Sequence, residues 1–241
     1  VGEAAGKMYG FVYDGTYKEE DFNITVNENG KKTYELKPGV PKFKDGCQPG
    51  DPKYKNIDGS EDNLITDNDR TVIGNGHPLH TGGFTNNFVY KNWDLNIFLQ
   101  WSYGNDVFNV NRLVMENPGA KKQLNQFASY KNRWSESNPT SNIPRVRAVG
   151  ADEYSSLYVE DGSFLKLKTI SLGYNFDTKT LKRIGLSAAR VFVSAENIAT
   201  ITGYSGSDPE VSTRHSVLTP GFDWSAYPRA FNASLGVNVT F

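Results

Sequence analysis

The last residues of the chain alternate strictly between apolar side chains and small or polar ones. The apolar positions are Phe231, Ala233, Leu235, Val237, Val239 and Phe241, and between them stand Asn232, Ser234, Gly236, Asn238 and Thr240. A period of two puts every apolar side chain on one face of a β-strand. Residues 231–241 also have about the length of a tilted strand that crosses a bilayer, roughly 9–11 residues.

A second alternating segment runs from Trp93 to Tyr103. Its apolar face carries Trp93, Leu95, Ile97, Leu99, Trp101 and Tyr103. The segment follows Phe84–Tyr90 across Lys91-Asn92, and this spacing predicts a tight hairpin. Aromatic residues at both ends of an apolar strip are typical of the girdles of membrane β-barrels.

Further segments have strand patterns and are separated by long connections. The segments are Phe164–Phe176, with Ile170, Leu172, Tyr174 and Phe176 on one face, then Ala189–Asn197, Tyr9–Tyr13 and Thr71–Gly74. The long connections are 16–69, 110–157 and 199–230. We therefore expect an all-β fold of six or seven antiparallel strands. Connections of this length are unusual in compact soluble domains, whereas long extracellular loops are normal in outer-membrane barrels.

The predicted strands are too few to form a complete membrane barrel. Six or seven strands do not close a barrel of useful size, and an open edge in lipid leaves backbone groups unpaired. The chain starts with Val1-Gly2-Glu3, without an initiator Met or an apolar leader. We therefore expect residues 1–241 to be the C-terminal part of a large transmembrane β-barrel. The alternative fold is a soluble β-sandwich, because its strands also alternate between apolar and polar residues.

The composition excludes several other classes of protein. Basic and acidic residues nearly cancel, 26 against 27, so the chain lacks the net positive charge expected of a nucleic-acid-binding protein. No apolar run is longer than three residues, whereas a transmembrane helix needs roughly 20. The single cysteine, Cys47, excludes an internal disulfide and a Cys-x-x-Cys zinc site.

An acidic segment between Asn56 and Asp69 has the spacing of a calcium-binding loop. The predicted ligands are the side chains of Asp58, Ser60, Asp62 and Asp69 and the carbonyl oxygen of Leu64. Asn63 takes the tight-turn position usually held by Gly, and Asn tolerates a left-handed backbone better than most residues. Because Ca²⁺ prefers clustered oxygen ligands, Ca²⁺ is the cofactor that this pattern predicts. The alternative is a solvated acidic turn.

No motif in the sequence points to catalysis. His77-Pro78-Leu79-His80 lacks a third ligand at metal-binding spacing, and no Gly-x-Ser-x-Gly nucleophile elbow is present. Nothing distinguishes the Glu160-Asp161 pair from the other acidic pairs of the chain. We therefore expect a protein that is not an enzyme.

Short motifs stand in a characteristic order along the chain. The first half contributes Tyr9-Gly10-Phe11, Pro49-Gly50-Asp51, Tyr54–Gly59, Asp69–Asn75 and Tyr90–Leu95. The second half contributes Arg133-Trp134, Val159–Lys168, Leu172-Gly173-Tyr174, Tyr204–Glu210, Tyr227-Pro228-Arg229 and the ending Val239-Thr240-Phe241. Together they resemble the C-terminal part of the SusC/RagA family of TonB-dependent outer-membrane transporters. The acidic turn is longer than in that family around Ser60-Glu61, so either Asn56 or Asp58 opens the predicted calcium loop.

The resemblance implies a location, partners and a substrate class. It implies a large barrel in the outer membrane, whose plug and TonB-contacting segment precede the part represented here. A SusD-like surface lipoprotein would be its partner, and the substrate would be an oligosaccharide or a peptide imported with energy from TonB. The alternative is a secreted, soluble β-sandwich module that binds glycans.

The resemblance also assigns residues to two surfaces. Those expected to face lipid or to guide barrel assembly are Trp93, Leu95, Ile97, Leu99, Val237, Val239 and Phe241. The residues expected to contact substrate are Tyr204, Asp208, Trp224 and Tyr227. Their aromatic faces and carboxylates suit the rings and hydroxyls of sugars. The alternative for each of the latter is packing within the loops.

Overall fold

The structure is a computed structural model that describes all residues except 1, 3, 118–124, 212, 214–215 and 217. The chain divides into two compact units. The first unit consists of Val1–Gly76, Val107–Glu160 and Val211–Ala226, and the second of His77–Asp106, Asp161–Glu210 and Tyr227–Phe241. Among the described residues, no helix is long and apolar enough to cross a membrane.

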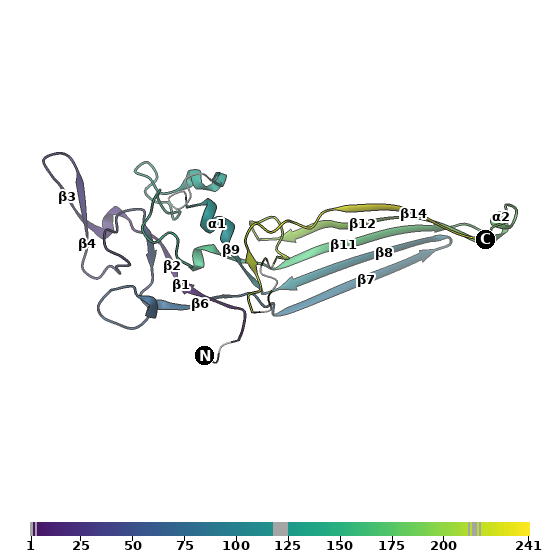
Figure 1. Ribbon diagram of the computed structural model, residues 1–241, viewed down its shortest axis with the longest axis horizontal. Coiled ribbons are helices and arrows are strands. Elements are labelled where there is room, and N and C mark those ends of the chain that lie inside the picture. The colour runs from purple at the N-terminus through teal and green to yellow at the C-terminus, as the bar shows by residue number, and fades with distance from the viewer. Residues whose placement is uncertain (1, 3, 118–124, 212, 214–215, 217) are drawn as a thin grey trace. The chain divides into compact units, whose positions relative to one another are not determined.

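The second unit is built on one antiparallel sheet of five strands, in the order β14-β12-β11-β8-β7 (Figure 1). The strands are β7 (His80–Tyr90), β8 (Trp93–Tyr103), β11 (Phe164–Asn175), β12 (Ala188–Thr202) and β14 (Asn232–Thr240). A short helix, α2 (Thr178–Lys182), follows β11. The long alternating segments of the sequence are therefore strands, and the prediction of an antiparallel all-β fold is confirmed.

The β7–β8 hairpin has the predicted two-residue connection. Tyr90 pairs with Trp93 across Lys91-Asn92, and Lys91 has a left-handed backbone with a φ of 53°. β7 begins earlier in the chain than its sequence pattern indicates, because glycines interrupt that pattern. Gly82 faces the Trp101 ring so closely that a Cβ atom there would lie 2.2 Å from it. Glycine within a strand is typical of such a close approach.

A β-bulge in β11 changes which positions of the strand are apolar. Leu167 pairs with Leu99 and Thr169 pairs with Phe98, so Lys168 is an extra residue. Before the bulge, the apolar face is occupied by the odd-numbered Leu165 and Leu167. After the bulge, the same face is occupied by the even-numbered Ile170, Leu172 and Tyr174. Sequence alternation predicted only the part of this face that follows the bulge.

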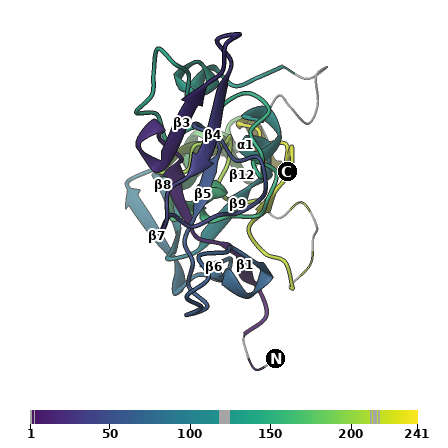
Figure 2. The ribbon, with the colours of Figure 1, turned by 90° about the vertical axis from the view of Figure 1, so that its left-hand side faces the viewer.

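The first unit consists of short strands joined by irregular segments. Antiparallel pairs are formed by β1 (Lys7–Phe11) with β6 (Arg70–Asn75), β2 (Tyr13–Thr16) with β5 (Pro52–Tyr54), and β3 (Phe22–Val26) with β4 (Lys32–Leu36). A small sheet contains β9 (Asp106–Asn109), β10 (Val159–Asp161) and β13 (Phe222–Asp223), and α1 (Val110–Met115) follows β9. Figure 2 shows the β3–β4 hairpin and the β1–β6 pair. The connection 16–69 therefore contains strands that are too short for a clear period of two.

Buried tyrosines hold these irregular segments together. The hydroxyl of Tyr54 donates a hydrogen bond to the carbonyl of Gly150 at 2.8 Å, and that of Tyr158 donates to Ala151 at 3.0 Å. Both tyrosine side chains are almost completely buried. Their rings supply apolar area to the core, while each hydroxyl satisfies a loop carbonyl that would otherwise be unpaired.

We expect Gly10→Ala to destabilise the first unit. A Cβ atom at Gly10 would lie 2.4 Å from the carbonyl oxygen of Tyr154, which accepts a hydrogen bond from the Phe11 amide. Overpacking of this kind costs about 1–3 kcal/mol. Thermal unfolding of the purified protein measures the loss. Gly203→Ala is the control, because no atom lies within 4 Å of a Cβ there; equal melting temperatures for the two variants would contradict the prediction.

Candidate functional site

The five strands of the second unit place the predicted membrane-facing residues on one face of the sheet. One row across the sheet contains Phe88, Leu95, Leu172, Val193 and Leu235. The next row contains Tyr90, Trp93, Tyr174, Val191 and Val237. Ile97, Leu99 and Val239 occupy the same face in neighbouring rows, and Phe241 follows the end of β14. We call this surface the apolar face.

Many side chains of the apolar face are exposed. Leu235 is 77% exposed, Val237 is 60% exposed and Phe88 is 54% exposed. A contiguous apolar surface of this kind indicates contact with a membrane or with another protein. That these residues contact lipid remains a prediction.

The opposite face of the same sheet carries its charged and most of its polar side chains, together with the rings of Phe98 and Phe192, and we call it the polar face. One row across it contains Asn87, Asn96, Ser171, Ser194 and Ser234. In β8 and β12, Asp94 and Arg190 form an ion pair with 2.5 Å between Oδ1 and the guanidinium. Gly173 lies beneath this pair, and a Cβ atom there would come within 2.6 Å of an Asp94 oxygen. The glycine therefore provides the space that the ion pair occupies.

A second group of charges on the polar face includes a buried lysine. Lys166 of β11 is 2% exposed, and its Nζ lies 3.3 Å from Asp208 Oδ1 and 3.0 Å from Glu210 Oε2. The same Glu210 oxygen lies 3.6 Å from Lys168 Nζ and 3.0 Å from Arg229 Nε. We call these five residues the Lys166 ion network. Burial opposes ionisation of Glu210, but the hydrogen bond and charge of Lys166 prevail and hold the pKa of Glu210 below its ordinary value.

The four predicted substrate contacts differ in accessibility. Tyr204 and Asp208 are buried, and the Asp208 carboxylate accepts hydrogen bonds from the backbone amides of Glu210 and Arg229 as well as from Lys166. Tyr227 is 90% exposed and Trp224 is 48% exposed. Tyr227 belongs to the second unit and Trp224 to the first. The accessible pair therefore fits the predicted contact with substrate better than the buried pair, for which the structure supplies a packing or ion-pairing role.

The acidic turn is held together by its own carboxylates. Asp69 is fully buried; its Oδ1 accepts hydrogen bonds from the amides of Ile57 and Asp58, and its Oδ2 accepts one from Thr66. Asn63 has the left-handed backbone that its place in the turn predicted, with a φ of 54°.

The other predicted calcium ligands bond within the turn. Asp62 accepts from the Ser60 hydroxyl and the Leu64 amide, and Asp58 accepts from the Ser60 amide. Over the described residues, no three His, Cys, Asp or Glu side chains form a group that could hold a metal. Calcium binding at this turn stays a prediction, and calorimetric titration tests it: absence of heat at millimolar calcium would remove it.

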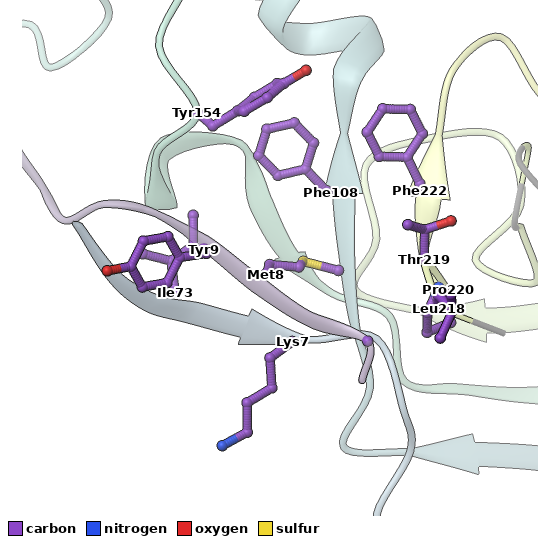
Figure 3. A pocket seen from close by; sticks show the side chains of 11 residues that line it. Lys7, Met8, Tyr9, Ile73, Phe108, Tyr154, Leu218, Thr219, Pro220 and Phe222 are labelled. Atoms are coloured by element: carbon purple, nitrogen blue, oxygen red, sulfur yellow. The ribbon is translucent and has the colours of Figure 1, made fainter. Parts of the chain in front are cut away.

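Two hollows lie in the first unit, and the acidic turn contributes Asn56, Ser60 and Asn63 to one of them. An apolar pocket of about 190 Å³ is lined by residues that include Met8, Ile73, Phe108, Tyr154 and Phe222. Figure 3 shows the Met8 side chain and the rings of Phe108 and Phe222 around it. A polar hollow is lined by Asp14, Pro41, Lys53, Tyr54, Lys55, Asn56, Ser60 and Asn63. Neither set of residues has a sequence spacing that would have revealed it.

Known proteins resemble all or most of the chain. TonB-dependent receptor P3 of Formosa agariphila is 34% identical over 245 residues, an alignment that covers 100% of this chain and 22% of that receptor. TonB-dependent receptor SusC of Bacteroides thetaiotaomicron is 30% identical over 164 residues, or 66% of this chain and 15% of SusC. The solved RagAB peptide importer in the 'closed-closed' state matches with a TM-score of 0.69 at 22% identity, over 98% of this chain and 23% of that one. No family model matches the chain.

The chain belongs with the SusC/RagA-like TonB-dependent receptors. The resemblance inferred from the sequence motifs is therefore confirmed, as is the assignment of the antiparallel strands to the fold of a β-barrel transporter. The receptors P3, P26 and P39 of Formosa agariphila each match all 241 residues of this chain, and the chain spans 22–25% of their length.

We expect the acidic turn of this receptor to lose stability in acid through Asp69. Burial of the Asp69 carboxyl favours the neutral form, but the amides of Thr66, Ile57 and Asp58 outweigh it and hold its pKa below the ordinary value. The charged carboxylate therefore contributes stability above its unfolded pKa of about 3.9, and this contribution is lost as the pH falls through the lower folded pKa.

Asp69→Asn should destabilise the turn by about 1–3 kcal/mol at pH 7, because a buried amide cannot satisfy all three donors. The deficit should shrink as the pH falls from about 5 to 2. Limited proteolysis of the turn, carried out at each pH, measures this loss of stability relative to the unmodified protein. The control is Asp67→Asn, since Asp67 is 87% exposed and pairs only at the surface with Arg70. A deficit that does not depend on pH would contradict this account.

Proposed function

We propose that the receptor containing this chain imports an oligosaccharide or a peptide across the outer membrane with energy from TonB. In this proposal the five-stranded sheet is part of the barrel wall. The apolar face contacts lipid, and the polar face contacts the interior of the barrel. The protein is a transporter in this account, and no step requires catalysis.

The observation that supports the proposal most strongly is the contrast between the two faces of one sheet. A strand that crosses an outer membrane alternates between lipid-facing and lumen-facing residues. The row through Leu95 is apolar on all five strands, and the adjacent row through Asn96 is polar on all five. A soluble β-sandwich would cover its apolar face with a second layer, whereas Leu235 and Val237 are exposed. This favours the membrane protein over the soluble glycan-binding module.

The names of two relatives support the proposed partner and substrate class. SusC is a TonB-dependent receptor, and RagAB is a peptide importer. We propose a SusD-like lipoprotein as the partner of this receptor, and an oligosaccharide or a peptide as its substrate. Tyr227 and Trp224 are the proposed contacts, because both present exposed aromatic rings that suit the faces of sugars or apolar side chains.

A lysine on the apolar face should block assembly into the membrane. In the full-length receptor, Ile97→Lys places a charge in lipid near the middle of β8, at a cost of about 2–4 kcal/mol near the membrane midplane. We expect less folded receptor in the outer-membrane fraction, measured by its heat-modifiable mobility on gels.

Asn96→Lys is the matched control for Ile97→Lys. It adds the same charge to the preceding residue of β8, on the polar face, where a lysine can reach water. Normal assembly of Asn96→Lys together with loss of Ile97→Lys supports the proposed orientation. Equal loss in both variants, or loss in Asn96→Lys alone, would contradict it.

Uptake should depend on TonB and on the proton-motive force. Cells that carry the receptor and its lipoprotein are given fluorescent oligosaccharides or fluorescent peptides in separate assays. We expect one class to accumulate inside the outer membrane and to stop doing so after deletion of TonB or addition of an uncoupler. Binding at the cell surface should persist under both treatments. Accumulation that is unaffected by loss of TonB would exclude the proposed mechanism.

A further inference from the structure

The Lys166 ion network joins three segments that are far apart in the sequence. Lys166 and Lys168 belong to β11, Asp208 and Glu210 follow β12, and Arg229 precedes β14. All five residues belong to the second unit. No motif in the sequence predicts that these charges meet, because each segment contributes only one or two of them.

The network is centred on a lysine that water does not reach. Lys166 is 2% exposed, while the side chains of Lys168 and Arg229 are 23% and 53% exposed. Burying an ammonium group is costly unless carboxylates pair with it closely. Asp208 and Glu210 supply that pairing at 3.3 and 3.0 Å.

The carboxylates also hold the backbone of both neighbouring segments. Asp208 Oδ1 accepts a hydrogen bond from the Glu210 amide at 3.0 Å, and its Oδ2 accepts one from the Arg229 amide at 3.2 Å. The Arg229 guanidinium in turn lies 3.0 Å from Glu210. The chain at 208–210 is therefore tied to the chain at 229, and both are tied to β11.

These ties lie where the chain leaves the second unit and where it returns. The second unit ends at Glu210 and resumes at Tyr227, and residues 211–226 belong to the first unit. The exposed Tyr227 is two residues from Arg229. The network thus fixes the two stretches of the second unit, at 208–210 and at 229, that flank residues 211–226 in the sequence.

We propose that Lys166 is a positioning residue, which through Asp208, Glu210 and Arg229 fixes the two segment ends of the second unit, 208–210 and 227–229, and with them the backbone that carries Tyr227. It does not contact substrate itself. The consequence for ligand binding rests on the proposed function, whereas the consequence for the order of the two segment ends does not.

Hydrogen exchange of the full-length receptor, followed by mass spectrometry, tests the proposal. In Lys166→Met, amides of 204–210 and 227–231 should exchange at least about tenfold faster, because the buried Asp208 carboxylate loses the ammonium group that it pairs with and Glu210 loses its link to β11. Amides of the β7–β8 hairpin should exchange as in the unmodified receptor. Lys179→Met in α2 is the matched control, because Lys179 is exposed and should change neither region.

Two further variants make the outcome decisive. If Lys166→Met does not assemble, Glu210→Gln tests the same network: it keeps the Lys166–Asp208 pair but removes the charge that links Lys166 to Arg229, so exchange at 204–210 and 227–231 should again be faster. Lys166→Arg keeps the charge and should restore most of the protection. Exchange that is unchanged in 204–210 and 227–231 would overturn the proposal. Equal acceleration in the β7–β8 hairpin would also overturn it, because Lys166 would then stabilise the whole sheet.

A binding measurement separates the inference from the proposed function. For whichever ligand class enters in the uptake assay, Lys166→Met should weaken binding to purified receptor, and Lys179→Met should not. Unchanged ligand affinity together with faster exchange would exclude the positioning of Tyr227 for substrate. If neither ligand class enters, the proposed function fails, and the exchange experiment still tests whether the network fixes the segment ends.

Discussion

Because side chains alternate along a strand, a shift of one residue in any strand of the five-stranded sheet would move its apolar side chains to the opposite face. The observed register keeps Leu95, Leu172, Val193 and Leu235 in one row, and Asn96, Ser171, Ser194 and Ser234 in the next. The bulge at Lys168 preserves this separation where the sequence of β11 changes parity. The Asp94–Arg190 pair and the Lys166 ion network lie on the polar face because of the same register. Every proposal about membrane contact and positioning therefore depends on it.

The first unit uses a different kind of interaction. Its strands have two to six residues, so they supply few ladder hydrogen bonds of their own. Side chains that reach backbone carbonyls of distant segments replace them: Tyr54 donates to Gly150, and Lys18 donates to Ser141. Hydrogen bonds of this type satisfy loop carbonyls that a regular sheet would otherwise pair. The connection 16–69 in this way contains folded structure, with Tyr17 and Phe22 in a buried cluster.

Sequence patterns predicted the features that depend on local periodicity. The five long strands, the Lys91-Asn92 hairpin and the left-handed Asn63 follow from alternation or from a single residue's backbone preference. The short strands within 16–69 were not predictable, because three to five residues give too few repeats of the period. The Lys166 ion network was not predictable either, since its members meet only through the register of β11 and the return of the chain at Tyr227. Asp208 shows why residue type alone does not predict the role of a site residue. Its carboxylate suggested a sugar contact, whereas its partners in the structure give it a role in ion pairing.

The central claim is that the apolar face contacts lipid and the polar face contacts water inside the barrel. Nitroxide spin labels on single cysteines at positions 95 to 99 of the full-length receptor, with Cys47→Ser and any other native cysteine replaced, test it most directly. The account predicts that labels at 95, 97 and 99 are relaxed mainly by oxygen, which partitions into lipid. Labels at 96 and 98 should be relaxed mainly by a water-soluble nickel complex. Loss of this alternation, or alternation with the opposite phase, would contradict the account.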